Sequence, residues 1–358
     1  MRFGINFFPT VSPEEKSGAQ FYDECLELTR RADELGYNSV KTVEHYFFAY
    51  GGYSPDPVTF LTAAAMVTKD LRLVTGAVIP AFSHPCKLAG KLAMLDNISH
   101  GRLDVGFARA FLPDEFAAFQ TSMEESRDRF NEGIEACRRL WSETDVVFKG
   151  KFHQFGPVTM LPRPYQKPHP PIWVAATFTA ESFEWAGRNG YNLMIVPYVS
   201  TREKVAELLK LYRDNYAQSG KEPGTEQIQM SYHCYIAEDG EAAQREGKLY
   251  FDDYTNKLLV AVSAWSRHKT DQYKGYEHLV EQIKRNTYED ALRDTKVFVG
   301  TPAQVAEQIA MVREWYGEVE PSLQINFGNM PHEAAQRSLE LFAAEVMPKY
   351  GTRVAATV

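Results

Sequence analysis

The chain has few cysteines and no long apolar run. Its 358 residues include only Cys25, Cys86, Cys137 and Cys234, and no two of these form a CxxC pair. This spacing excludes a thiolate zinc knuckle and a disulfide framework. No apolar run approaches the roughly 18 residues that cross a bilayer, and the first residues lack the apolar core and cleavage site of a signal peptide. We therefore expect a soluble, reduced, cytoplasmic protein.

Positive charge is also scarce. The sequence has 39 lysines and arginines against 47 acidic residues, and 39 − 47 gives a net charge of −8. No lysine- or arginine-rich cluster is present, and phosphate-backbone binding requires concentrated positive charge. These features exclude a nucleic-acid surface, so we expect no nucleic-acid partner and no membrane partner.

Several catalytic signatures are missing as well. The sequence contains no G-x-G-x-x-G and no G-x-x-x-x-G-K-[ST], which argues against Rossmann dinucleotide and P-loop sites. It contains no G-x-S-x-G, which argues against an α/β-type serine hydrolase. No HxH or HExxH spacing accompanies the histidines, so we expect no metal. Aromatic residues, at 13%, are abundant and fit either a large apolar pocket or a bulky core.

Short apolar strands alternate with amphipathic helices along most of the chain. The predicted strands are 2–8, 39–42, 71–79, 102–107, 172–176, 193–196, 227–236 and 322–327. Each is followed by a helical pattern, and such alternation indicates a parallel sheet of right-handed βαβ units. Eight units predict one α/β domain over 1–358, a single (β/α)8 TIM barrel. The insertions would be at about 108–122, 143–171 and 240–295, with a hairpin and a proline-rich loop in the second.

In such a barrel the active site lies at the carboxyl ends of the strands. Arg109 follows a strongly apolar strand, and a charge there requires a carboxylate or an anionic ligand. Thr179 and Ser182 open a helix whose free N–H groups suit a phosphate. The residues also fit a plainer reading, in which Thr179 only caps its helix and Arg109 pairs with a surface acid.

Seven motifs follow one another along this pattern. They are 32–37 (ADELGY) with 42–47 (TVEHYF), 75–80 (TGAVIP) with His84-Pro85, 95–103 (LDNISHGRL), 107–110 (FARA), 123–127 (MEESR), 171–177 (PIWVAAT) and 299–302 (VGTP). In this order they resemble the bacterial luciferase-like flavin-dependent monooxygenase family, over about 1–235 and 296–347. The resemblance implies the barrel fold and a flavin at its carboxyl-end mouth.

The resemblance also implies how FMN is held. Arg109, with Thr179 and Ser182 at the helix start opened by Thr177, would bind the phosphate. Residues 75–77, which are Thr75, Gly76 and Ala77, would pass behind the flavin ring, where the family has a non-prolyl cis peptide. This implication favours the phosphate reading over the capping reading.

The same resemblance implies the chemistry. A separate NAD(P)H:flavin reductase would supply reduced FMN, and O2 would form a flavin 4a-hydroperoxide that oxygenates a small organic substrate, in a secondary-metabolite tailoring step. His45 would be the catalytic base or hydrogen-bonding group, with Glu44 beside it. The expected pocket walls are Phe7, Phe47, Phe111, Trp173, Tyr198 and Phe327. A homodimer is expected, because family members are often dimers.

Two residues depart from the pattern of the light-emitting members. Tyr46 stands where a second histidine is usual, and Ala108 stands where those luciferases carry a reactive cysteine. Both changes favour oxygenation of an organic substrate over bioluminescence. Two alternatives remain: an oxidoreductase that transfers hydride with the deazaflavin F420 and without O2, or a non-catalytic flavin-binding subunit.

Overall fold

Eight parallel strands close into a barrel in this computed structural model, which describes residues 1–351. The strands pair in the order β1-β2-β3-β4-β7-β8-β9-β11, and β11 returns to β1. Their bounds are β1 Gly4–Phe7, β2 Ser39–Thr42, β3 Arg72–Val78, β4 Leu103–Phe107, β7 Ile172–Ala176, β8 Asn192–Ile195, β9 Ile228–Ile236 and β11 Glu320–Gln324. The predicted (β/α)8 barrel is confirmed; residues 352–358 of the expected domain lie outside the described residues.

Helices surround the barrel. They are α1 Gly18–Leu35, α2 Pro57–Val67, α3 Pro85–Ile98, α5 Ser126–Ser142, α6 Ala180–Arg188, α7 Arg202–Tyr216, α11 Pro302–Tyr316 and α12 His332–Glu345. Helix α1 shows which local signals in the sequence predict a helix. Ser17 caps α1, one apolar face including Phe21 and Leu28 is buried, and the helix ends at Gly36 with a left-handed φ of 84°, which glycine adopts without steric cost.

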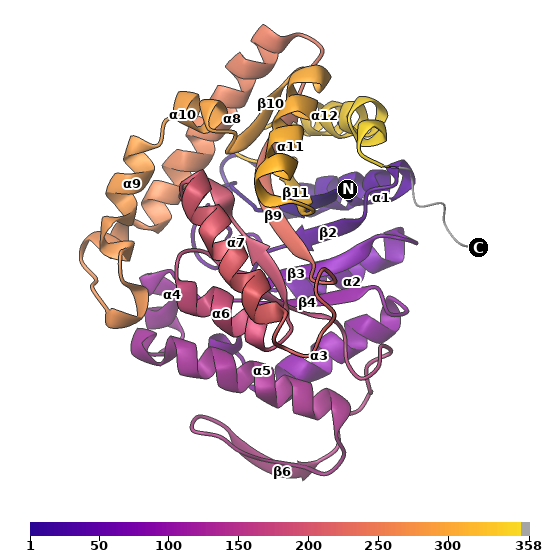
Figure 1. Ribbon diagram of the computed structural model, residues 1–358, viewed down its shortest axis with the longest axis vertical. Coiled ribbons are helices and arrows are strands. Elements are labelled where there is room, and N and C mark those ends of the chain that lie inside the picture. The colour runs from indigo at the N-terminus through magenta and orange to yellow at the C-terminus, as the bar shows by residue number, and fades with distance from the viewer. Residues whose placement is uncertain (352–358) are drawn as a thin grey trace.

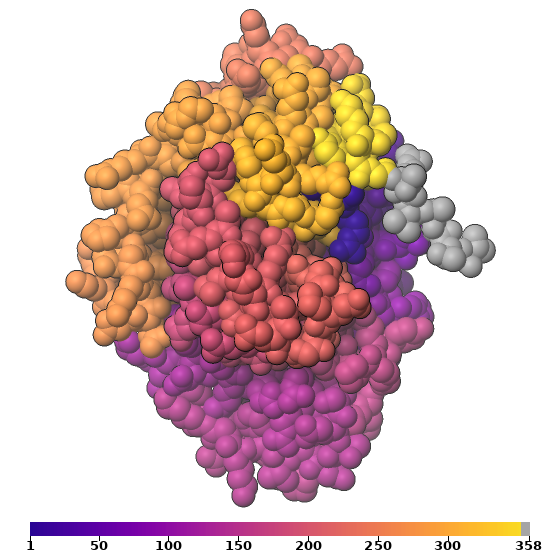
Figure 2. Space-filling view, viewed as in Figure 1, coloured from indigo at the N-terminus to yellow at the C-terminus, as the bar shows by residue number. Residues whose placement is uncertain are grey.

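The carboxyl end of the barrel is covered by two insertions. The first holds α4 Pro113–Ala118, and the second holds α8 Gly240–Ala261, α9 Leu279–Arg285, α10 Tyr288–Arg293 and the short 3-10 turns η4 Ser263–Ser266, η5 Asp271–Tyr273 and η6 Tyr276–His278. These elements gather at the left of Figure 1. In the space-filling view the orange surface of the second insertion lies beside the rose surface of α6 and α7 (Figure 2).

A ninth strand closes the second insertion. β10, Val297–Gly300, pairs in parallel with the outer half of β9, from His233 to Ile236. The sequence prediction of eight strands missed it, because a four-residue apolar run that ends in glycine has no distinguishing period. β9 thus extends beyond the barrel wall, and its inward-facing His233 sits at the level of the mouth.

The predicted hairpin in the 143–171 segment is present. β5 Val146–Lys149 pairs antiparallel with β6 Gln154–Val158, and the hairpin projects at the bottom of Figure 1, away from the carboxyl end. Its turn is attached to α5, because the carboxylate of Glu132 accepts the backbone N–H groups of Lys151, Phe152 and His153. This position separates the hairpin from the candidate site.

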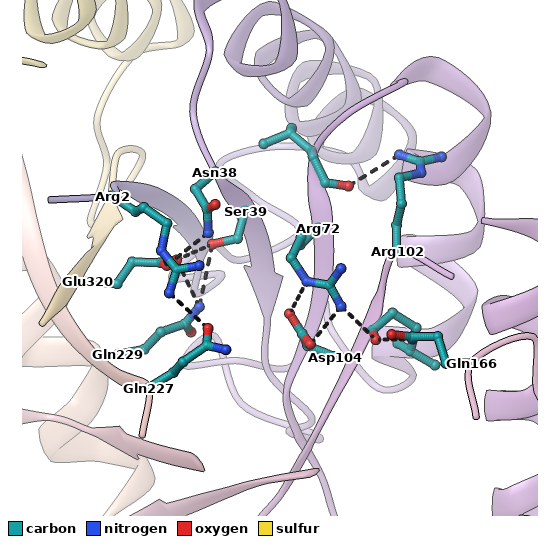
Figure 3. Close-up of polar contacts among 12 residues, drawn as sticks. Arg2, Asn38, Ser39, Arg72, Arg102, Asp104, Gln166, Gln227, Gln229 and Glu320 are labelled. Carbon is teal, nitrogen blue, oxygen red and sulfur yellow. Dashed lines mark hydrogen bonds and ion pairs between the residues drawn. The ribbon is translucent and has the colours of Figure 1, made fainter. Parts of the chain in front are cut away.

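The amino end of the barrel is closed by buried polar contacts. The carboxylate of Glu320 accepts hydrogen bonds from Asn38, Ser39 and Gln229, and Arg2 lies 3.5 Å away (Figure 3). Two neighbouring strands are joined by an ion pair between Arg72 and Asp104, also drawn in Figure 3. In a TIM barrel this end serves stability, whereas chemistry is placed at the other end.

The barrel interior has an apolar side and a polar side. Val74, Trp173 and Met194 pack together on the side of β3, β7 and β8. On the side of β2 and β9, Lys41 is buried and donates a hydrogen bond to Ser231 Oγ over 3.0 Å, and burial lowers the pKa of Lys41 to about 8. Separately, no helix within residues 1–351 is both long and apolar enough to cross a membrane.

Candidate functional site at the carboxyl end of the barrel

A histidine–carboxylate pair lies at the end of β2. His45 Nδ1 is 3.0 Å from Glu115 Oε1, and the same oxygen accepts the backbone N–H of Tyr46 over 2.9 Å. Because this carboxylate oxygen is an acceptor, we assign the Nδ1 proton to His45, which leaves Nε2 as the basic nitrogen. Glu115 is fully buried on α4. The pair therefore has the form of an oriented general base.

Aromatic rings surround His45. Phe8, Tyr50 and Phe111 have ring centroids 5.5, 5.8 and 5.5 Å from it, and Phe111 meets it edge-on. Behind the imidazole lies Gly51, where an added Cβ would be 2.5 Å from His45 Cβ and where φ is +85°. Only glycine fits both conditions, so the backbone fixes the position of this histidine.

Glu44 faces away from that pair. Its two oxygens accept the Tyr46 hydroxyl over 2.8 Å and the backbone N–H of Ile79 over 3.0 Å. Glu44 therefore ties the end of β2 to the end of β3. Burial raises the pKa of Glu44 to about 7, because a charged carboxylate is poorly solvated there. The sequence placed Glu44 beside His45 as a catalytic residue, but these contacts describe a residue that positions the mouth.

The raised pKa of Glu44 predicts a pH-dependent stability. The folded-state pKa of about 7 lies above the ordinary 4.5, so the folded protein binds this proton more tightly than the unfolded chain. The stabilising contribution of Glu44 to the free energy of unfolding is complete below about pH 4.5. It is lost as the pH rises through 7, by up to about 3 kcal/mol. Urea unfolding of Glu44→Gln should lack this fall between pH 5 and 8. A Glu307→Gln control, exposed on α11, should keep it; parallel profiles for wild type and Glu44→Gln would contradict the assignment.

The segment expected behind a flavin ring lies at the end of β3. The peptide bond between Gly76 and Ala77 is cis, which places the expected non-prolyl cis peptide at this bond. A Cβ on Gly76 would lie 2.3 Å from Lys41 Cγ, so the glycine leaves room for that buried side chain. Thr75 exchanges hydrogen bonds with the backbone N–H and C=O of Gly106. The side chain of Thr75 is thus used between β3 and β4, and it does not face the mouth.

Arg109 follows β4 and has no carboxylate partner among the described residues. One of its terminal nitrogens donates to Ser126 Oγ over 3.0 Å and to the carbonyl oxygen of Gln272 over 2.9 Å. Its guanidinium lies 4.5 Å from the ring centre of Tyr273, while its buried Nε has no hydrogen-bond partner in that part of the chain. A partly buried guanidinium with an unused donor fits an anionic ligand.

A second arginine strengthens this anion site. Burial, and then repulsion from nearby Arg109, lower the pKa of Arg127. Arg127 pairs over 3.2 Å with Glu181, whose side chain is 68% exposed. At the start of α6, the hydroxyls of Thr179 and Ser182 bond to each other over 2.8 Å, and Thr179 makes no side-chain cap bond to the helix. Two guanidiniums and a helix N-terminus fit a phosphate.

One wall of rings joins the anion site to His45. Phe111, which meets His45, has its ring centre 6.3 Å from that of Tyr276, and Tyr276 meets Phe178 edge-on at 5.3 Å. Tyr276 also lies near Thr177, which precedes the start of α6. The structure therefore brings His45, Arg109, Thr177, Thr179 and Ser182 to one end of the barrel, as the sequence predicted.

Four of the six expected aromatic walls lie at the mouth or in the barrel. Phe111 borders His45, and Tyr198 lines a cavity of about 770 Å³. Trp173 and Phe327 are buried in or near the barrel interior.

Two of the expected walls take other positions. Phe7 packs edge-on against Phe60 of α2, between the barrel and its helices, because its strand parity points it outward. Phe47 is 64% exposed and lies against Phe119.

Sequence reasoning missed three polar residues of this end. Glu115 and Arg127 stand 70 and 18 residues from the strand-end residues that they serve, His45 and Arg109. His233 lies within the run of buried residues of β9. The motif at 123–127 contains Arg127 and was the only signal for it. Nothing local marks the other two, because their roles depend on contacts between distant segments.

Comparisons with known proteins agree with this geometry. The model of the family described as luciferase-like monooxygenase matches residues 1–318. A protein of Acinetobacter baylyi named flavin-dependent trigonelline monooxygenase, oxygenase component, is 31% identical, over 98% of this chain and 96% of that protein. The crystal structure of monooxygenase RslO1 from Streptomyces bottropensis is 52% identical, with a TM-score of 0.87, over 98% of this chain and 100% of that chain.

A third comparison shows the fold. The oxygenating constituent of 3,6-diketocamphane monooxygenase from Pseudomonas putida, a type II Baeyer–Villiger monooxygenase in complex with FMN, has a TM-score of 0.81 and 21% identity. The alignment covers 98% of each chain. At this identity the likeness concerns the arrangement of strands and helices alone.

Proposed function

Because this chain belongs to the luciferase-like monooxygenase family, we propose that it is an FMN-dependent oxygenase of a small organic substrate. In this proposal reduced FMN and O2 supply the oxidant, a flavin 4a-hydroperoxide, and the chain's residues hold, orient and protect the reactants. The observation that carries the proposal is the continuous ring wall between the oriented base, His45, and the anion site at Arg109.

The residues have distinct roles in this proposal. Arg109, Arg127 and the start of α6 bind the FMN phosphate through charge-assisted hydrogen bonds. The backbone at Gly76 and Ala77 borders the flavin ring. The aromatic wall excludes water from the reacting atoms. His45 Nε2 then accepts or returns a proton while Glu115 holds the Nδ1 side of the ring.

We also propose the setting of this enzyme. The relative from Acinetobacter baylyi is named an oxygenase component, which supports a separate NAD(P)H:flavin reductase as the source of reduced FMN. Residues 1–358 would form one catalytic domain, acting as a homodimer in the cytoplasm. Size-exclusion chromatography with light scattering measures the oligomeric state directly.

The choice of cofactor is tested by anaerobic titration. We expect reduced FMN to bind saturably, one per chain, because the anion site matches a single terminal phosphate. Titration with F420 under the same conditions serves as the comparison. Tight F420 binding together with no measurable affinity for reduced FMN would contradict the proposal and favour hydride transfer without O2.

A further inference from the structure

A large cavity opens beside the carboxyl ends of β8 and β9. Its volume is about 770 Å³, within the range of pockets that hold organic ligands. Helices α8, α9 and α10 of the second insertion contribute much of its lining. Its inner wall is rich in rings and holds one buried imidazole; these residues are Phe178, Tyr198, His233, Phe251 and Tyr254. A planar, ring-bearing ligand fits such a wall.

His233 is the unusual residue of this wall. It is fully buried, yet neither of its ring nitrogens has a hydrogen-bond partner within residues 1–351. Burial lowers the pKa of His233 to about 3, so the imidazole is neutral near pH 7 and offers one donor and one acceptor. Leaving such groups unpaired is unfavourable, and a hydrogen bond to a ligand oxygen would remove that cost.

The neighbouring strands continue this polar row. Gln324 of β11 lies in register with His233, and Asn6 of β1 lies in register with Gln324. Gln324 Oε1 and Asn6 Oδ1 are also buried without partners in the described chain. Three adjacent strands thus present unpaired polar atoms in register with one another, beginning at His233 in the cavity wall.

Two tyrosine hydroxyls complete the cluster. The hydroxyls of Tyr198 and Tyr254 are 3.1 Å apart, and the two rings lie 5.0 and 4.3 Å from the ring of His233. The Tyr254 hydroxyl is also 3.5 Å from that of Tyr50, which packs beside His45. The cluster therefore leads from the cavity toward the candidate base, and its members carry no formal charge near pH 7.

We infer that His233 and the Tyr198–Tyr254 hydroxyl pair form a binding site for a neutral oxygen, a phenol hydroxyl or a ketone carbonyl, on a ring-bearing substrate. That the ligand is a substrate rests on the proposed function, and the inference adds its chemical class. A ligand that lacks the oxygen would leave the buried polar atoms unpaired, and such sites discriminate strongly against the deoxy analogue.

The test compares binding of 2-naphthol and naphthalene, measured by fluorescence with the FMN-free protein. The wild type should bind 2-naphthol at least about tenfold more tightly, the value of one well-formed hydrogen bond in a buried site. His233→Phe should reduce this preference to near one, and Tyr254→Phe should reduce it in part. The matched control Phe251→Leu, in the same wall, should weaken both ligands alike and keep the preference.

The outcomes separate this inference from the proposed function. Equal binding of the two ligands by the wild type, or an unchanged preference in a folded His233→Phe variant, would overturn the oxygen site. Loss of the preference in His233→Phe with retention in Phe251→Leu supports it, whatever the reaction with O2. FMN affinity, measured in parallel, should be the same in the wild type and all three variants, since Arg109 and α6 are untouched. Circular dichroism verifies that each variant is folded.

Discussion

Replacing Arg109 by alanine should weaken FMN binding by about 10- to 150-fold, because each charge-assisted hydrogen bond contributes about 1.5–3 kcal/mol. Arg109 has a buried, unused Nε and no carboxylate partner among residues 1–351, so its charge is available for the phosphate. Isothermal titration with FMN under anaerobic, reducing conditions measures the change.

Riboflavin provides the internal comparison, since it carries the same ring without the phosphate. Arg109→Ala should leave riboflavin affinity unchanged, so the ratio between FMN and riboflavin affinities should fall toward one. Arg127→Ala should act in the same direction, and a smaller further loss in the double variant would show that both arginines bind one group. Arg30→Ala, on α1 and paired with Glu34, serves as a control. An unchanged ratio in Arg109→Ala would remove Arg109 from the site.

Replacing His45 by glutamine should lower kcat by about 10²- to 10⁴-fold, the range of general acid–base catalysis. Glutamine keeps a hydrogen-bonding side chain and removes the basic nitrogen. FMN affinity should be unchanged, because the phosphate contacts lie at Arg109 and α6. Steady-state product formation with a saturating supply of reduced FMN measures kcat. A variant with nearly wild-type kcat would show that His45 does not act on the reacting atoms.

We propose that Glu115 positions His45, and the variant Glu115→Gln is measured in the same assay. Glu115→Gln can still accept the Tyr46 N–H, so the local backbone should be retained while the negative charge is lost. The carboxylate fixes the tautomer and the orientation of the imidazole ring, so kcat should fall in this variant while the affinity for FMN stays unchanged. A nearly wild-type kcat would show that the charge of Glu115 is not needed to orient His45.

The barrel was predictable because its signals are local. The helical patterns expected after the strands are present, for example as α3, and α1 ends at the left-handed Gly36. Periodicity and capping residues report short-range structure, and the strict alternation of strands and helices limits the topology. β10 was missed, because its four residues carry no period of their own.

The candidate site was predictable only in part. His45 and Arg109 follow strands, and the carboxyl ends of parallel strands meet at one end of a barrel. Their partners come from elsewhere: Glu115 is on a short inserted helix, and no local pattern links it to His45. Phe7 was wrongly expected in the pocket, because a strand alternates its faces at every residue and the sequence did not settle which face pointed inward.

The most direct measurement is rapid mixing of the anaerobic complex between the protein and reduced FMN with oxygenated buffer, followed by absorbance. We expect a flavin 4a-hydroperoxide spectrum that forms before oxidised FMN and persists, because the ring wall around His45 and Tyr276 keeps water from the reacting atoms. Direct appearance of oxidised FMN, at the rate measured for free reduced FMN, would show that this chain is not a flavin-dependent oxygenase.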